Sequence, residues 1–306
     1  LAWIPGEEPE VARGPKWPTL VAAAKRVREG KVGDPEQVIA HRASSASAMQ
    51  DFMGPLMARR PIVTWAVAGL SVGLFGLQML WGGGEPYASG MRMGAAVKGL
   101  IDDGQLWRLV APMVLHGSVI HLIFNMTALF GFGTFLERFL GWRRYLVLYV
   151  ASGVGGGIAS YLRPDEVVSV CASGGIWGLM IAGAVLVTLP RGLLPRMVSE
   201  VQKKRAWTPV LINGFYSFQP GVDLLAHLGG GVVGGLLLLS GLLTRGVPAC
   251  EQSNDPDRPP RKESALVTIT AVVCGLLVLG SVGAAFATAR PWELLGAPAL
   301  LRTAIP

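Results

Sequence analysis

Two polar residues, Ser173 and His227, stand near the starts of two long apolar segments. Polar side chains inside membrane helices are costly, so those that remain usually face the interior of the helix bundle and mark function. A serine hydroxyl is a poor nucleophile until a neighbouring base takes its proton. A neutral imidazole can act as that base near pH 7 and can return the proton to a leaving amine. The pair therefore predicts acyl transfer by a serine nucleophile and a histidine base.

Other residues are placed to stabilise the oxyanion that acyl transfer generates. His121 and Asn125 are four residues apart, so they share one face of a helix. If Ser173 begins a helix, its backbone N–H lacks an intrahelical acceptor and can serve as another donor. Trp177, one helical turn after Ser173, is placed to pack against the ring of His227. The sequence thus predicts an oxyanion hole beside the two reacting residues.

Asp223 precedes His227 by one helical turn and could orient its ring. We interpret it instead as a residue that faces water at the mouth of the site or caps a helix start. The sequence therefore predicts a dyad rather than a triad.

Such a dyad requires two helices that approach closely. Gly174 and Gly178 follow Ser173, and Gly231 and Gly235 lie at four-residue spacing from His227. Small residues at this spacing allow membrane helices to pack with their backbones close together.

Each of these residues also has a simpler interpretation. A lone serine in a membrane helix usually bonds to its own backbone, a lone histidine usually packs, and Asn125 could join two helices. His116 and His121 are five residues apart, which puts them about 140° apart on an ideal helix. No carboxylate or cysteine accompanies them, so we expect no metal site. The conjunction of the polar residues favours the catalytic interpretation.

The composition indicates a polytopic membrane protein. Of 306 residues, 51% are hydrophobic and 15% are charged, whereas soluble domains carry about a quarter charged residues. Mean hydropathy is +0.46. The net charge of +7 comes without a basic stripe interleaved with aromatics, so we expect no nucleic-acid partner. Cys171, Cys250 and Cys274 form neither a disulfide framework nor a zinc-binding pattern.

The N-terminal segment shows no basic stretch followed by an apolar one, so we expect no signal peptide there. Because the chain begins without Met, we expect a fragment or a processed product.

Seven later segments approach the length of about 20 residues that a membrane helix needs. The fifth is the weakest, because it is short and holds Pro209, Asn213 and Gln219. The predicted spans are 61–82, 112–136, 144–162, 168–190, 206–219, 222–243 and 264–288.

The positive-inside rule orients these spans. With the N-terminus in the cytoplasm, 21 of the 27 Lys and Arg residues fall on the inner side. Spans 2, 4 and 6 then run inward, and their polar residues reach the outer half of the membrane at similar depth. Only His41 of the four histidines lies elsewhere.

Residues 61 to 243 resemble the rhomboid family of intramembrane serine proteases. The resemblance rests on the order and spacing of several short motifs rather than on any one of them. They are Gln105-Leu106-Trp107-Arg108, His116-x4-His121-x3-Asn125, Glu137-x3-Gly141, Ala172-Ser173-Gly174 and Ala226-His227-x-x-Gly230.

The resemblance implies a role for each matching position. Ser173 would be the nucleophile and His227 the general base, with His121, Asn125 and the Ser173 amide as the oxyanion hole. The remaining positions would support the site: His116 as a structural or water-binding residue, Gly174 beside the nucleophile, Trp177 as the usual aromatic, Trp107 and Arg108 in the first outer loop, and Glu137 holding the loop after span 2.

Two features depart from the family pattern. Cys171 stands where the family usually has glycine, so a positive φ there would be strained. The fifth span is short and polar, and in this family that helix is implicated in lateral entry of the substrate.

We therefore expect an all-α, multi-pass membrane protein with a rhomboid-like six-helix bundle and one C-terminal helix. The predicted organisation is a cytoplasmic region over 1–60, a catalytic core over 61–243, a cytoplasmic linker over 244–263, and a seventh helix with its tail over 264–306. The predicted location is a bacterial inner membrane, with the site open to the outer side.

The predicted function is hydrolysis of peptide bonds in or near transmembrane segments of other membrane proteins, without a metal or organic cofactor. The expected partners are those substrates and the lipid bilayer. Two alternatives remain: a catalytically silent rhomboid-like binder, supported by Cys171, and a channel or transporter with a polar His/Asn path. The second would be favoured by inverted repeats, and we see none.

Overall fold

The computed structural model describes residues 50–81, 86–164, 168–170, 172–188, 205–245 and 264–288, with a few single residues between them. The helices described below belong to the unit that begins at Phe52. Cys171, most of 1–60 and 244–263, and the C-terminal tail lie outside the described residues. The main helices are α3 (Ile62–Trp81), α6 (Val119–Ala128), α7 (Thr134–Leu140), α8 (Trp142–Tyr161), α9 (Ser173–Thr188), α11 (Thr208–Tyr216), α12 (Leu224–Leu239) and α14 (Ala265–Thr288).

Three stretches of helix in the described part of the chain are long and apolar enough to cross a membrane. They are Ile62–Trp81, Val119–Leu140 and Ala265–Thr288, and the apolar helices α9 and α12 are shorter. The predicted third span holds α8, which has 20 residues but begins with Arg143 and Arg144 in its first turn. The predicted fifth span holds α11, which has only nine residues.

The second predicted span begins later than we expected from hydropathy. Residues 112–118 are not α-helical, because Pro112 lies in the short 3₁₀ turn η2 (Ala111–Val114) and Ser118 caps α6. The Ser118 hydroxyl accepts a hydrogen bond from the His121 amide at 3.1 Å, as N-cap serines do. One π-helical segment, η3 (Leu129–Gly133), joins α6 to α7. Gly141, with φ of +84°, then separates α7 from α8.

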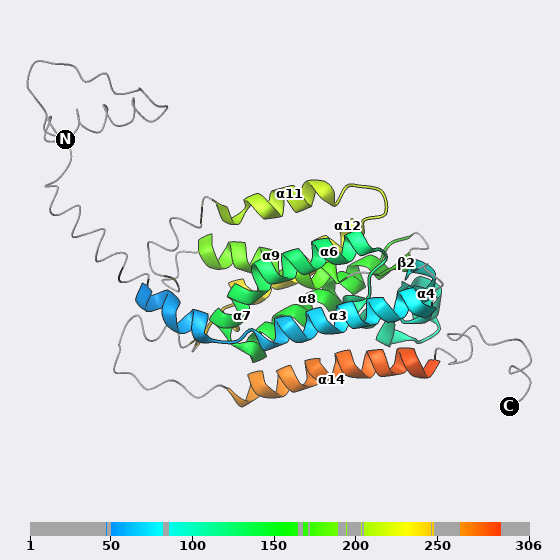
Figure 1. The fold of residues 1–306 in the computed structure, drawn as a ribbon, viewed down its shortest axis with the longest axis horizontal. Coiled ribbons are helices and arrows are strands. Elements are labelled where there is room, and N and C mark those ends of the chain that lie inside the picture. Colours follow the sequence, from blue (N-terminus) through cyan, green and yellow to red (C-terminus); the bar gives the residue numbers. More distant parts are fainter. Residues whose placement is uncertain are drawn as a thin grey trace, which may run out of the picture. The chain divides into compact units, whose positions relative to one another are not determined.

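Helices α8, α9 and α12 pack with their backbones in close contact. A Cβ at Gly156 would lie 2.7 Å from the carbonyl oxygen of Ala226, and one at Gly178 would overlap Ser152. These contacts hold the starts of α9 and α12 together, so that Ser173 and His227 can meet. Figure 1 shows α11 along one side of this group of helices and α14 along the opposite side.

Glu137 joins the end of the second long helix to the start of α3. Its carboxylate accepts hydrogen bonds from the amides of Val63 and Thr64, both at 2.8 Å, and from the Thr64 hydroxyl at 2.7 Å. First-turn amides lack intrahelical acceptors, so the buried carboxylate satisfies donors that α3 cannot. The expected role of Glu137 in holding this region is consistent with these contacts.

The segment between α3 and α6 is folded against the helices by short polar contacts. It contains α4 (Pro86–Arg92), α5 (Lys98–Asp102) and η1 (Leu106–Leu109). The buried Arg108 guanidinium donates to the carbonyl oxygens of Met91 at 2.9 Å and Ala95 at 2.8 Å, and burial lowers the pKa of this guanidinium. Strand β1 (Ala96–Val97) pairs antiparallel with β2 (Val168–Ser169). This pairing anchors the chain just before Ser173.

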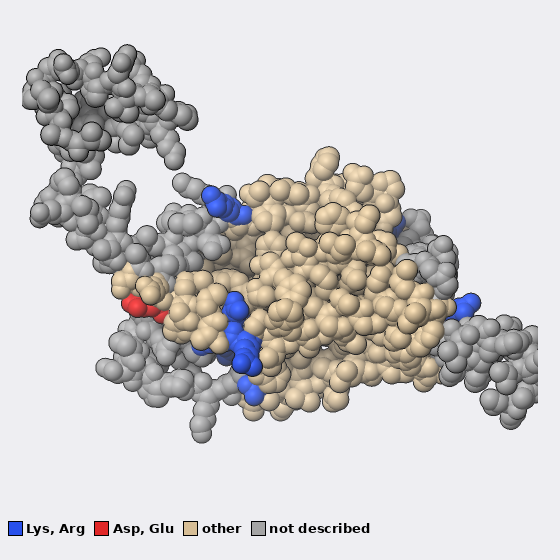
Figure 2. All heavy atoms as spheres, in the orientation of Figure 1, with Lys and Arg blue, Asp and Glu red and all other residues tan. Residues whose placement is uncertain are grey.

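Charged side chains in the described part of the chain lie near the ends of the helices. Figure 2 shows a broad uncharged surface between them. Near one end, the Arg138 guanidinium donates to the Arg59 carbonyl oxygen at 3.0 Å, and Arg144 donates to that of Arg245 at 3.0 Å. Such a surface suits a lipid environment, where backbone groups are satisfied within helices and charges lie at the interfaces.

Candidate active site

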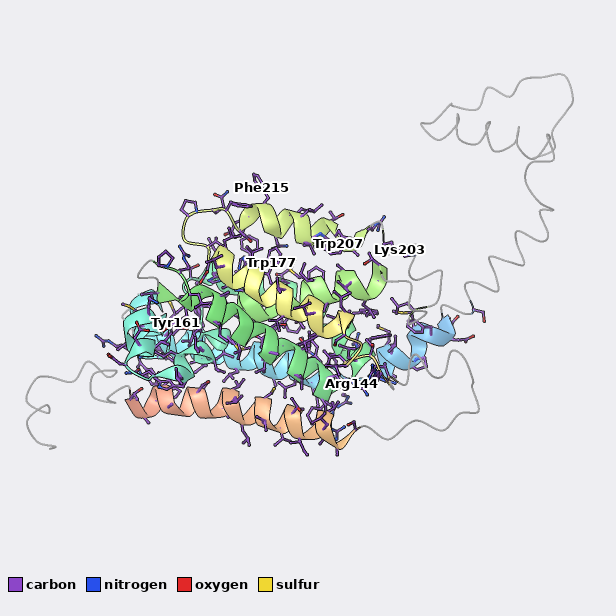
Figure 3. The ribbon with its side chains drawn as sticks, turned by 180° about the vertical axis from the view of Figure 1, so that it is seen from behind. Arg144, Tyr161, Trp177, Lys203, Trp207 and Phe215 are labelled. Carbon is purple, nitrogen blue, oxygen red and sulfur yellow. The ribbon has the colours of Figure 1, made fainter. Side chains whose placement is uncertain are left out.

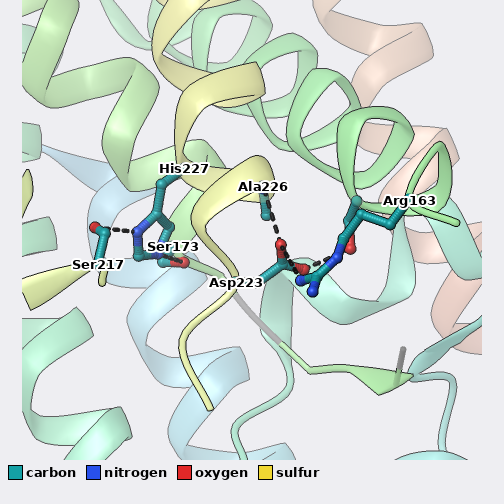
Figure 4. Close-up of polar contacts among 7 residues, drawn as sticks. Arg163, Ser173, Ser217, Asp223, Ala226 and His227 are labelled. Atoms are coloured by element: carbon teal, nitrogen blue, oxygen red, sulfur yellow. Dashed lines mark hydrogen bonds and ion pairs between the residues drawn. The ribbon is translucent and has the colours of Figure 1, made fainter. Parts of the chain in front are cut away.

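Ser173 and His227 meet at the starts of α9 and α12. The Ser173 Oγ lies 2.5 Å from His227 Nε2 (Figure 4), and both residues are buried, with 6% of their surface exposed. Ser173 is the first residue of α9, and His227 lies in the first turn of α12. The distance is short enough for a hydrogen bond. A base in this position can take the hydroxyl proton directly.

The other ring nitrogen of His227 contacts a residue that the sequence analysis missed. Ser217 Oγ lies 2.7 Å from His227 Nδ1, and Ser217 is 1% exposed. Ser217 is the C-cap of α11. A serine that follows a marginal helix carries no sequence signal for catalysis, so only the tertiary structure reveals this contact.

Trp177 stacks on the histidine ring, as its position one turn after Ser173 led us to expect. The ring centroids of Trp177 and His227 are 5.2 Å apart and the planes make an angle of 22°. Figure 3 shows Trp177 inside the bundle, between α11 and the neighbouring helices. This stacking restricts rotation of the imidazole about its Cβ–Cγ bond.

A cavity of about 820 Å³ opens beside the serine and the histidine. His121 and Asn125 line it together with Ser173, Trp177 and His227. Asn125 is buried, and its Nδ2 has no hydrogen-bond partner within the described residues. A buried donor without a partner is uncommon, and this one borders the cavity.

His116 lies behind His121 rather than in the cavity. The two imidazole centroids are 5.5 Å apart, and His116 is fully buried and absent from the cavity lining. The Gln78 side chain bonds the His116 backbone on both sides, donating to its carbonyl at 3.0 Å and accepting from its amide at 3.3 Å. These contacts suit a structural residue.

Asp223 caps the start of α12, and its carboxylate bonds groups other than the histidine ring. Its carboxylate accepts from the Ala226 amide at 3.0 Å and from the Ser160 hydroxyl, and it lies 3.8 Å from the Arg163 guanidinium. Figure 4 shows this group on the other side of the helix start from His227. The interpretation of Asp223 as a cap is confirmed, and Asp223 is not the residue that contacts Nδ1.

The remaining predicted residues do not line the cavity. A Cβ at Gly174 would lie 3.3 Å from the Ala226 carbonyl oxygen, so glycine keeps α9 and α12 close. Trp107, Arg108 and Glu137 do not line the cavity. The described residues contain no cluster of three or more His, Cys, Asp or Glu side chains able to hold a metal ion.

The geometry is that of a serine beside a histidine base, enclosed by apolar helices. Comparison with known proteins identifies the family of the chain. A model of the Rhomboid domain family matches residues 103–244. The chain is 35% identical over 139 residues to Putative rhomboid protease YdcA of Bacillus subtilis (strain 168). The aligned region is 45% of this chain and 68% of that protein. The chain therefore belongs to the rhomboid family.

Two other relatives are longer than the matched region. Rhomboid protease GluP of Bacillus subtilis (strain 168) is 32% identical over 184 residues, which is 60% of this chain and 35% of that protein. RHOMBOID-like protein 5 of Arabidopsis thaliana is 38% identical over 148 residues, which is 47% of this chain and 46% of that protein. The chain thus spans less than half of these two relatives. Its family and its long apolar helices make it an integral membrane protein.

Proposed function

We propose that this protein is an intramembrane serine endopeptidase that cleaves peptide bonds in or near transmembrane segments. The observation that carries the proposal is the 2.5 Å contact between Ser173 Oγ and His227 Nε2 beside a buried cavity. Relatives named as rhomboid proteases support the same reaction class.

The proposed reaction runs in two steps. The His227 Nε2 takes the proton from Ser173 as the Oγ attacks the substrate carbonyl carbon, and the imidazolium then protonates the leaving amine as the peptide bond breaks. Water next attacks the acyl-serine ester, gives a proton to Nε2, and releases the carboxylic acid as the proton returns to Ser173. Both steps pass through an oxyanion. His121, Asn125 and the Ser173 amide are the proposed donors for it.

The proposed topology is the six-plus-one arrangement of the predicted spans, with 61–243 as the catalytic core and the N-terminus in the cytoplasm. The asymmetry of Lys and Arg along the chain supports this orientation. The site would then open to the outer side of a bacterial inner membrane, and the substrates would be other transmembrane proteins.

The function can be tested with wild-type protein and Ser173→Ala in liposomes that contain a transmembrane substrate. We expect wild type to cleave the substrate and to react with a fluorophosphonate at Ser173, and we expect the alanine variant to do neither. If folded wild type does neither, the protein is better described as a silent rhomboid-like binder. If Cys171→Gly then cleaved the substrate or reacted with the fluorophosphonate, Cys171 would be the cause of the inactivity of wild type.

Asn125→Ala should lower kcat by about 10²- to 10³-fold, the usual effect of removing one oxyanion donor. Because the interaction forms with the developing charge, KM should change little. The kinetics of cleavage in liposomes measure both parameters. Thr127→Ala in the same helix is the matched control, since Thr127 does not line the cavity and its hydroxyl donates to the Ile123 carbonyl oxygen at 2.8 Å. Equal kcat values for the two variants would remove Asn125 from the oxyanion hole.

A further inference from the structure

We infer that Ser217 is a positioning residue that holds His227 in the tautomer required of a general base. This inference rests on the proposed function, and it concerns a residue outside the family motifs in this sequence. It follows from the hydrogen bonds of one buried hydroxyl group.

The Ser217 hydroxyl has two neighbours at 2.7 Å. One is the backbone carbonyl oxygen of Asn213, and the other is His227 Nδ1. The carbonyl oxygen can only accept a hydrogen bond, whereas the hydroxyl has a single proton and two lone pairs. If that proton goes to Asn213, the hydroxyl can satisfy Nδ1 only by accepting from it.

This arrangement decides where the imidazole carries its proton. A neutral imidazole protonated at Nδ1 has a lone pair at Nε2. Nε2 is the atom that lies 2.5 Å from Ser173 Oγ. The hydrogen bonds then run in one direction, from Ser173 to His227, from His227 to Ser217, and from Ser217 to Asn213 (Figure 4 shows the first two contacts).

The opposite tautomer would disable the dyad. If Ser217 donated to Nδ1, the proton of the ring would be on Nε2, and Nε2 could not accept from Ser173. Asn213 would also lose the hydroxyl as a donor. Ser217 is 1% exposed, so water competes poorly with Asn213 or His227 for its hydroxyl group.

The same contact persists when the ring becomes charged. During attack, Nε2 gains the serine proton, and both ring nitrogens become donors. Nδ1 then still donates to the Ser217 oxygen, so the hydroxyl does not need to rotate. Trp177 stacks on the face of the ring, and Ser217 contacts its Nδ1 edge. Asp223, which bonds Ala226 and Ser160 instead, does not supply this contact.

The kinetic test compares wild type with Ser217→Ala and Ser217→Thr. Removing the acceptor should lower kcat about tenfold, the effect of one net hydrogen bond. The KM should stay within about twofold, because Ser217 does not line the cavity. Threonine retains the hydroxyl, and we expect it to restore most of kcat. Ser281→Ala is the matched control, since Ser281 is also buried but its hydroxyl donates to the Val278 carbonyl oxygen of its own helix at 2.8 Å.

A spectroscopic test does not depend on cleavage. In ¹⁵N-histidine-labelled protein, the resonances of His227 are assigned by their loss in His227→Gln. We expect wild type to carry the proton on Nδ1, and Ser217→Ala to show a mixture of tautomers. Protonation at Nε2 in wild type, or a kcat for Ser217→Ala equal to that of Ser281→Ala, would overturn the inference. Absence of cleavage by wild type with the Nδ1 proton present would instead contradict the proposed function alone.

Discussion

His227→Ala is expected to lower kcat for a transmembrane substrate by at least about 10³-fold, because the serine loses its general base. The His227 Nε2 lies 2.5 Å from the Ser173 Oγ, within hydrogen-bond distance. Fluorophosphonate labelling of Ser173 should fall with kcat, since the probe also requires an activated serine. His41→Ala provides the matched histidine control, because His41 lies outside the residues matched to the Rhomboid domain.

The double variant sharpens this test. If Ser173 and His227 act as one unit, Ser173→Ala/His227→Ala should be no slower than either single variant. A double variant slowed by the product of the two single effects would mean that the residues contribute independently. If His227→Ala still cleaved the substrate and still reacted with the fluorophosphonate at Ser173, another group would have to activate the serine.

Gly230→Ala is expected to destabilise the protein by about 1–3 kcal/mol through overpacking. An added Cβ would lie 2.6 Å from the carbonyl carbon of Gly174 and 2.9 Å from its Cα. Backbone atoms cannot rotate away as a side chain can, so α9 and α12 would have to separate. These helices carry Ser173 and His227, and we therefore expect activity to fall together with stability.

Gly76→Ala is the control for this second effect. Gly76 lies in α3, and an added Cβ there would meet no atom within 4 Å. Alanine has the higher helix propensity, so this variant should be neutral or slightly more stable. The midpoints of thermal unfolding in detergent compare the stabilities of Gly230→Ala and Gly76→Ala. Equal midpoints would show that the contact between Gly230 and Gly174 does not limit the approach of the helices.

The membrane class, the main apolar segments and the candidate dyad could be predicted from the sequence. Hydropathy over about 20 residues reports whether a segment can lie in lipid. The spans it predicted over 61–82 and 264–288 agree closely with α3 and α14. The four-residue spacing of His121 and Asn125 placed them on one helix face, and both line the cavity. The start of α6 was predicted too early, because hydropathy does not register that Ser118 caps the helix.

The hydrogen-bond partners of the site were decided only by the tertiary structure. Ser217 and Asp223 both precede His227, yet the nearer residue caps α12, while the one ten positions away contacts Nδ1. Sequence spacing determines which residues share a face of one helix. It does not determine which atoms of two helices come within 3 Å, because that depends on how closely their backbones approach and where the turn between them ends. Glycines such as Gly174 and Gly230 permit the approach, and the packed helices set the distances.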